Sequence, residues 1–180
     1  REHDTLGGRA GCAGGSVHSN GTRSSPMHHA KRLLVVAHAP SANTEALRYA
    51  VMAGAHEVPE VDTVVLGPFE TGPTDVLAAQ ALVLGTTENL GYMSGALKDF
   101  FDRCYYPVLE HTEGLAYALY VRAGQDGTGT LRAVQSIATG LKWQAAHEPV
   151  ICRGAWDDRF LERVRELGLY MAAGLDAGIL

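Results

Sequence analysis

The sequence predicts an α/β fold, a doubly wound five-stranded parallel sheet with strand order 2-1-3-4-5. Short apolar runs alternate five times with segments of helical periodicity between residues 31 and 180. Most of the runs are continuously apolar instead of alternating with polar residues, which is typical of strands buried on both faces. Right-handed crossovers then place helices on both sides of the sheet.

The first predicted strand covers residues 33–37 and ends at a His-Ala-Pro turn. A helix follows it, because apolar residues recur there at helical spacing. Either Asn43 or Thr44 can cap this helix, and Glu45 lies in the first turn, where the helix dipole favours a carboxylate. Its apolar face consists of Leu47, Ala50, Val51 and Gly54.

The second and third predicted strands cover residues 61–67 and 81–85, and the short crossover between them has room for one or two helical turns around residues 75–79. The helix after the third strand has the clearest amphipathic pattern in the chain, with Ser94 as its natural N-cap. Its apolar stripe consists of Leu97, Phe100, Phe101, Cys104, Tyr105 and Val108. The opposite side carries Lys98, Asp99, Asp102 and Arg103.

The fourth predicted strand covers residues 115–124, and the fifth covers residues 148–154. The helix between them has an apolar face of Leu131, Val134, Ala138 and Leu141. The last helix begins at Asp157 or Asp158, both of which suit a helix start. Its apolar face consists of Phe160, Leu161, Val164, Leu167, Gly168 and Met171.

The composition indicates one globular domain preceded by a different kind of segment. The chain has 180 residues, of which 46% are hydrophobic and 19% are charged, an ordinary globular balance. Residues 1–30 contain many Gly and Ser and few large apolar residues, so burial cannot offset their ordering entropy. We therefore predict a flexible N-terminal extension at residues 1–30 and a folded domain at residues 31–180.

Charge and hydropathy argue against two classes of partner. The formal net charge is -5 at pH 7, whereas binding to a nucleic-acid backbone favours a basic surface. No apolar run approaches the roughly 18 residues that a membrane span needs. We expect neither nucleic acid nor a membrane as a partner.

The cysteines and histidines do not indicate a metal site. Cys12, Cys104 and Cys152 are scattered and form no C-x-x-C pair, which favours structural roles and a reducing cytoplasm. The Met-His-His tract at residues 27–29 is interpreted as solvated surface histidines in preference to a metal-binding tract. No metal is predicted.

Three loops of unusual composition follow the first, third and fourth predicted strands: HAPSANT, TTENLGYMSG and AGQDGTG. In the order 2-1-3-4-5 these three strands are adjacent at the topological switch point. Ligands of such sheets bind there, outside the carboxyl ends of the strands. Together the loops predict one shared binding site, although each alone is also compatible with a plain turn.

The first two loops suit different parts of a ligand. Ser41, Asn43 and Thr44 offer donors to a phosphate at a helix N-terminus, although these residue types are also ordinary helix caps. The glycines of the second loop allow backbone to approach a flat ring, and Tyr92 either stacks on that ring or covers the core. Short donors in this loop are Thr86, Thr87 and Asn89.

Residues 32 to about 175 resemble the flavodoxin-like flavoproteins, in particular the NAD(P)H-dependent FMN reductase and quinone oxidoreductase branch. The most specific stretch is GYMSGALKDFFDRC, which is similar to the G-x-M-[SA]-x-x-[LM]-K-x-F-x-D-R run of that family. HAPSANTEAL is similar to its S-x-N-T phosphate loop. The chain departs from the family at Thr86, which no Pro follows, and at Leu90, where an aromatic residue is common.

The resemblance implies a noncovalent FMN site residue by residue. The phosphate would be held by Ser41, Asn43 and Thr44. The ring and ribityl chain would lie along Thr86, Thr87, Glu88, Asn89, Gly91, Tyr92 and Met93. The other edge of the ring would be lined by Gly124, Gln125, Gly127 and Thr128.

The implied activity is NAD(P)H-dependent reduction of quinones or similar small acceptors through FMN, in a cytoplasmic homo-oligomer, either a dimer or a tetramer. No side-chain nucleophile is required, and the catalytic residues are not identified; Tyr92 or Tyr106 as proton donor competes with a structural role for each. Two alternatives stay open: an electron-transfer protein of flavodoxin type, and an FMN-free flavodoxin-like interaction domain. The mild acidity of the chain favours the enzyme.

Overall fold

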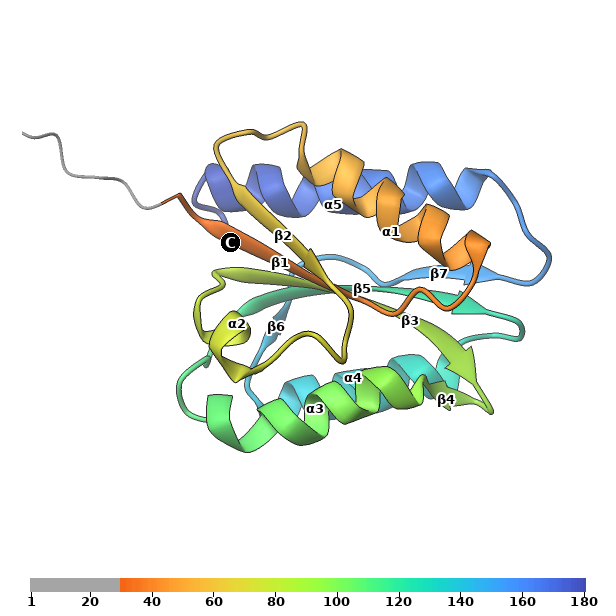
Figure 1. Cartoon of the computed structure of the whole chain (residues 1–180), viewed down its shortest axis with the longest axis horizontal. Helices are drawn as coiled ribbons and strands as arrows, with labels where there is room; N and C mark the ends of the chain where they lie inside the picture. Colours follow the sequence, from red (N-terminus) through yellow and green to blue (C-terminus); the bar gives the residue numbers. More distant parts are fainter. Residues whose placement is uncertain (1–29) are drawn as a thin grey trace, which may run out of the picture.

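The computed structural model describes residues 30–180 and consists of a central sheet with helices on both faces (Figure 1). The predicted N-terminal extension, Cys12 and the Met-His-His tract therefore lie outside the described residues. The strands are β1 (Arg32–Ala37), β2 (Asp62–Leu66), β3 (Ala81–Asn89), β4 (Tyr92–Met93), β5 (Ala116–Ala123), β6 (Gln144–Ala145) and β7 (Val150–Arg153). The helices are α1 (Ala42–Ala55), α2 (Pro73–Leu77), α3 (Gly95–Val108), α4 (Thr128–Gly140) and α5 (Arg159–Asp176).

The predicted strand order is confirmed. The sheet runs β2-β1-β3-β5, and the fifth position beside β5 is shared by β6 and β7, two short strands where the sequence predicts one. All of these neighbours pair in parallel. The strands β1, β3 and β5 are largely buried, which explains their continuous apolar runs, whereas β2 is half-buried.

The predicted end of the third strand is wrong. The strand continues beyond Gly85 to Asn89, turns at Leu90 and Gly91, and returns as β4, which pairs antiparallel with it. Both turn residues have positive φ angles, 53° and 73°. Two such residues make a turn that matches the twist of a hairpin, so most of the predicted loop is a β-hairpin.

Two apolar cores lie on opposite faces of the sheet. The helices α1 and α5 cover one face, and α2, α3 and α4 cover the other, as Figure 1 shows. At the end of α5, the Lys31 ammonium group donates to the carbonyl oxygen of Leu175 at 2.8 Å, so the start of β1 is tied to the last helix. None of the helices within residues 30–180 combines the length and apolar character required to cross a membrane.

The predicted N-cap is correct for α3 and wrong for α1. Ser94 caps α3, because its hydroxyl oxygen accepts from the backbone N–H of Leu97 at 3.2 Å. Helix α1 is capped by Ser41, two residues before Asn43 and three before Thr44, the two residues that the sequence analysis gave as caps. Thr44 is the third helical residue and completes a capping box with Ser41.

Gly85 lies in β3 beneath the ring of Tyr120, which comes from the neighbouring strand β5. A Cβ atom on residue 85 would come within 2.3 Å of the Tyr120 Cζ atom. The tyrosine ring is fully buried, so it has no free space into which it can move. Only glycine therefore allows this contact.

We expect Gly85→Ala to lower the free energy of unfolding by about 1–3 kcal/mol, the usual cost of overpacking a closed core. Gly95→Ala is the matched control, because a Cβ on Gly95 meets nothing within 4 Å. The control should leave stability unchanged or raise it slightly. Urea denaturation of both variants measures the difference, and equal stabilities would contradict the packing described here.

Candidate functional site

Three connections leave the carboxyl ends of adjacent strands and lie at one edge of the sheet, on the right of Figure 1. The last residue of β1, Ala37, is opposite Gly85 of β3, and Gly85 is opposite Tyr120 of β5. The loop before α1, the β3–β4 hairpin and the loop before α4 thus belong to the same edge. We call this the carboxyl edge.

In the first connection, the structure gives Ser41 and Thr44 a defined local role. The Ser41 backbone N–H donates to Thr44 Oγ1 at 2.9 Å, and the Thr44 backbone N–H donates to Ser41 Oγ at 3.3 Å. Thr44 is buried, whereas Asn43 is exposed beside it. Both hydroxyl groups are thus used in capping, and Asn43 together with the N-terminus of the 14-residue helix α1 faces outward.

The hairpin is braced from within by short polar side chains. The Ser94 backbone N–H donates to the buried Thr86 Oγ1 at 3.1 Å, which fixes the base of the hairpin to the start of α3. The Thr87 hydroxyl donates to Asn89 Oδ1 at 2.7 Å. Met93 is buried, whereas Asn89, Gly91 and Tyr92 are exposed, with Tyr92 at 42%.

Glu88 joins the hairpin to the loop before α4. Its Oε1 atom accepts from the backbone N–H of Gln125 at 2.9 Å, and its Oε2 atom accepts from the backbone N–H of Gly127 at 2.7 Å. Hydrogen bonds to a carboxylate are stronger than those between neutral groups. The two connections that the sequence analysis assigned to opposite sides of a ring are therefore tied to each other.

A second contact brings the hairpin onto the N-terminus of α4. The buried Thr130 hydroxyl donates to the carbonyl oxygen of Tyr92 at 3.0 Å. At Gly129, a Cβ atom would come within 1.9 Å of the Gly91 carbonyl oxygen, so the backbones meet because residue 129 has no side chain.

One hydrogen bond lies within the loop before α4 itself. The Thr128 backbone N–H donates to Asp126 Oδ1 at 2.9 Å, and this bond holds the pKa of the Asp126 carboxyl below its usual range. Gly127 adopts a φ of 73° and is buried. Gly124, Gln125 and Thr128 are exposed, so the open part of the loop lies beside the Glu88 bonds.

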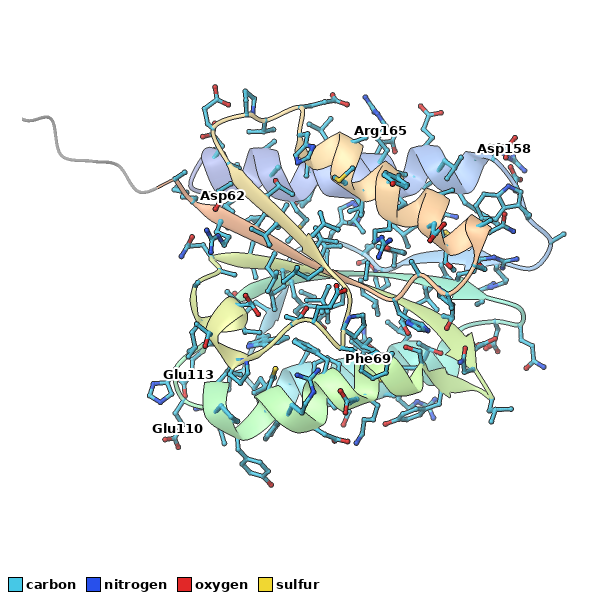
Figure 2. The ribbon with its side chains drawn as sticks, viewed as in Figure 1. Asp62, Phe69, Glu110, Glu113, Asp158 and Arg165 are labelled. Carbon is cyan, nitrogen blue, oxygen red and sulfur yellow. The ribbon has the colours of Figure 1, made fainter. Side chains whose placement is uncertain are left out.

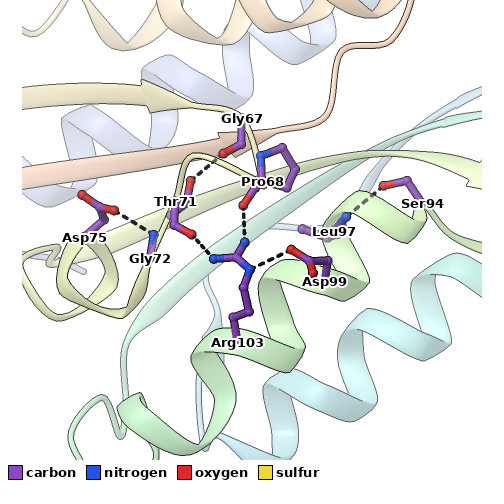
Figure 3. A network of polar contacts seen from close by, with 9 residues as sticks. All are labelled: Gly67, Pro68, Thr71, Gly72, Asp75, Ser94, Leu97, Asp99 and Arg103. Carbon is purple, nitrogen blue, oxygen red and sulfur yellow. Dashed lines mark hydrogen bonds and ion pairs between the residues drawn. The ribbon is translucent and has the colours of Figure 1, made fainter.

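Arg103, at the end of the DFFDR run, has a role that the sequence did not reveal. It extends from α3 to the loop between β2 and α2, where it donates to the carbonyl oxygens of Pro68 at 2.7 Å and Thr71 at 2.8 Å (Figure 3). Asp99 accepts from its Nε atom at 2.7 Å. Arg103 therefore fixes this loop, whereas the helical pattern indicated only a side chain opposite the apolar stripe.

The cysteines and Tyr106 fall outside the carboxyl-edge site. Cys104 and Cys152 are buried and unbridged, and burial raises the pKa of each thiol to about 11, which suits structural residues. Tyr106 is exposed near the C-terminal end of α3, at the opposite edge of the sheet. Of the two predicted proton donors, only Tyr92 lies at the carboxyl edge.

No protein-family profile matches the sequence, and no curated protein matches it significantly. Solved structures do match. A flavodoxin from the domain Archaea has a TM-score of 0.68 at 18% identity, covering 81% of this chain and 99% of that one.

A flavodoxin, WrbA-like protein from Agrobacterium tumefaciens matches with a TM-score of 0.64 at 15% identity, over 82% of this chain and 98% of that one. An oxidoreductase from Corynebacterium diphtheriae matches with a TM-score of 0.61 at 16% identity, over 83% and 98%. At these identities the likeness shows the fold alone. The predicted flavodoxin-like fold is confirmed.

His38 leads to a prediction about pH. The ring is partly buried at the end of β1, and desolvation lowers its pKa below the ordinary value of 6.5. Below pH 6.5 the His38 ring binds a proton more readily in the unfolded chain than in the folded chain. The free energy of unfolding therefore falls as the pH decreases through that value. In urea titrations between pH 7 and pH 5, His38→Asn should remove the part of the stability loss that His38 causes. An NMR titration midpoint of His38 at or above 6.5 would contradict the assignment.

Glu88→Gln tests the tie between the two connections. An amide side chain offers one acceptor atom where the carboxylate offers two, so the Gln125 and Gly127 amides should exchange with solvent about tenfold faster or more. The control is Glu113→Gln, which removes a surface ion pair with Lys142 at the opposite edge. Unchanged protection of both amides in the Glu88 variant would show that the carboxylate does not hold the loop.

Proposed function

We propose that this protein binds FMN noncovalently at the carboxyl edge and acts as an NAD(P)H-dependent oxidoreductase that reduces quinones or similar small acceptors. The observation that carries the proposal is the position of three polar connections at one switch point of a flavodoxin-like sheet. Solved structures of the same fold include proteins described as flavodoxins, a WrbA-like protein and an oxidoreductase.

The groups at the first connection fit a phosphate ester. The capping box of Ser41 and Thr44 fixes the entry to α1, so the remaining N–H groups of the first turn point outward in a rigid arrangement. Asn43 adds an exposed amide and no charge. Asn43 and the first turn of α1 would hold the phosphate, with Ser41 and Thr44 acting mainly by shaping the turn.

The other two connections fit a flat, uncharged ring. Gly91 and Gly124 are exposed, so backbone groups at both residues are accessible without a side chain above them, except for the Gly91 carbonyl oxygen, which packs against Gly129. Glu88, Thr86 and Thr130 keep the hairpin and the loop before α4 in fixed positions through hydrogen bonds. Rigid walls lower the entropy cost of binding.

The chemistry that FMN supplies when bound is hydride transfer from a nicotinamide to an acceptor. The residues of this chain then have three tasks: to hold the phosphate, to orient the ring and to keep one face of it open. Tyr92 is the exposed aromatic side chain of the hairpin and would contact the ring or donate a proton to an acceptor.

Two alternatives rest on specific observations. An electron-transfer protein is favoured by the match to an archaeal flavodoxin along nearly its whole length. An FMN-free interaction domain is favoured by Glu88, which already uses two backbone N–H groups of the loop before α4. We further propose a cytoplasmic homo-oligomer, on the basis of the family resemblance.

The absorption spectrum of the purified protein, with and without added FMN, tests the proposal directly. We expect a bound flavin that is released on denaturation, and consumption of NAD(P)H in stoichiometric amounts with a quinone. Flavin binding without such consumption would favour the electron-transfer protein. No flavin binding would favour the interaction domain.

Asn43→Asp tests the phosphate position. The new carboxylate would repel a phosphate at close range, so FMN affinity should fall about tenfold or more. Helix stability should not fall, because an acidic residue in the first turn suits the helix dipole. Ser136→Asp adds the same charge on an exposed part of α4 and serves as control. If both variants bind FMN like the parent protein, the phosphate lies elsewhere.

A further inference from the structure

A hollow opens beside the first connection, on the side that faces β2. It has a volume of about 200 Å³ and lies between the end of β1, helix α1 and the loop that joins β2 to α2. The polar and aromatic side chains that line it are His38, Arg48, Phe69 and Glu70. We call it the β2-side hollow.

Arg48 supplies a positive charge to this hollow. It belongs to α1 and is partly buried, and no carboxylate within residues 30–180 forms an ion pair with it. Glu70 also lines the hollow, but its Oε2 atom accepts from the backbone N–H of Gly67 at 3.0 Å. The guanidinium group is therefore available to an anionic ligand, and its planar fork suits a phosphate.

Phe69 supplies an aromatic face on a fixed support. Its side chain is 69% exposed, and Figure 2 shows it at the front of the molecule near α3. The residues on both sides of it are held, because Arg103 binds the carbonyl oxygens of Pro68 and Thr71. An exposed ring on a braced loop can stack on a flat ligand at little entropy cost.

A buried hydroxyl group lies in the core behind the hollow and is not part of its lining. The Tyr120 ring crosses Gly85 of β3, so its hydroxyl extends from β5 in the direction of β1, whose last residue, Ala37, lines the hollow. This hydroxyl has no hydrogen-bond partner among residues 30–180, although the side chain is only 2% exposed. A buried donor without a partner is costly unless a ligand or solvent oxygen satisfies it.

We propose that the β2-side hollow binds the phosphorylated adenosine end of the nicotinamide cosubstrate, with Arg48 on a phosphate and Phe69 stacked on the base. This assignment rests on the proposed function, because it takes the dinucleotide as the reductant. The hollow adjoins the first connection, so a dinucleotide held there can extend its other end along the carboxyl edge.

The test uses the full chain loaded with FMN and two probes, adenosine 2′,5′-bisphosphate and adenosine, measured by titration calorimetry. Arg48→Gln should weaken the bisphosphate about tenfold or more and leave adenosine unchanged, because only the phosphate contacts the guanidinium. Phe69→Ala should weaken both probes. Glu70→Gln should strengthen the bisphosphate, since a nearby negative charge is removed.

Arg132→Gln is the control, because Arg132 is exposed on α4, which covers the opposite face of the sheet. Equal affinity of the Arg48 variant and the parent protein for the bisphosphate would overturn the proposal. Equal weakening of both probes by Arg48→Gln, or no binding of the bisphosphate by the parent protein, would also overturn it. Failure of FMN binding is measured separately by the flavin spectrum. If FMN does not bind, the same titrations on the flavin-free chain still decide whether this hollow takes the nucleotide.

Discussion

The carboxyl edge of the sheet depends on the contact between Gly85 and Tyr120. With no side chain on residue 85, the tyrosine ring lies flat across β3 and carries its hydroxyl group toward β1. The ring fills the core under the first connection, and the strand continues past it into the hairpin. The packing of the large Tyr120 ring on Gly85, which has no side chain, thus determines where the buried core ends beneath the carboxyl edge.

The polar connections that lie above this core are held mainly by hydrogen bonds to one another. Glu88 binds two amides of the loop before α4, Thr130 binds the hairpin, and Arg103 binds the loop between β2 and α2. Few of these bonds belong to regular sheet or helix. They make the edge rigid without covering it, so the exposed groups that remain, such as Asn43 and Gln125, are presented in fixed positions.

The sequence predicted the layers of the fold and the edge where the polar connections meet, because continuous apolar runs and helical stripes depend on burial, which is local to each element. It missed the hairpin, since the turn has Leu90 at a position where Asn or Gly usually signals a positive φ angle. It missed the functions of Glu88 and Arg103 because both side chains act on backbone groups about 30 or more residues away, which no periodicity records. The separation of the fifth position into β6 and β7 was also missed, because β6 has only two residues, both exposed, and so has no continuous apolar run.

The pairing of α1 with α5 has a consequence for how the molecule is made. The first and last helices share one face of the sheet, and Lys31, just before β1, binds the end of α5. During synthesis, the 18 residues of α5 leave the ribosome after every other helix and strand described here. Until they do, the apolar residues of β1 and α1 on that face are not covered by α5, so the nascent chain needs protection from aggregation while the elements from β1 to α5 are being made.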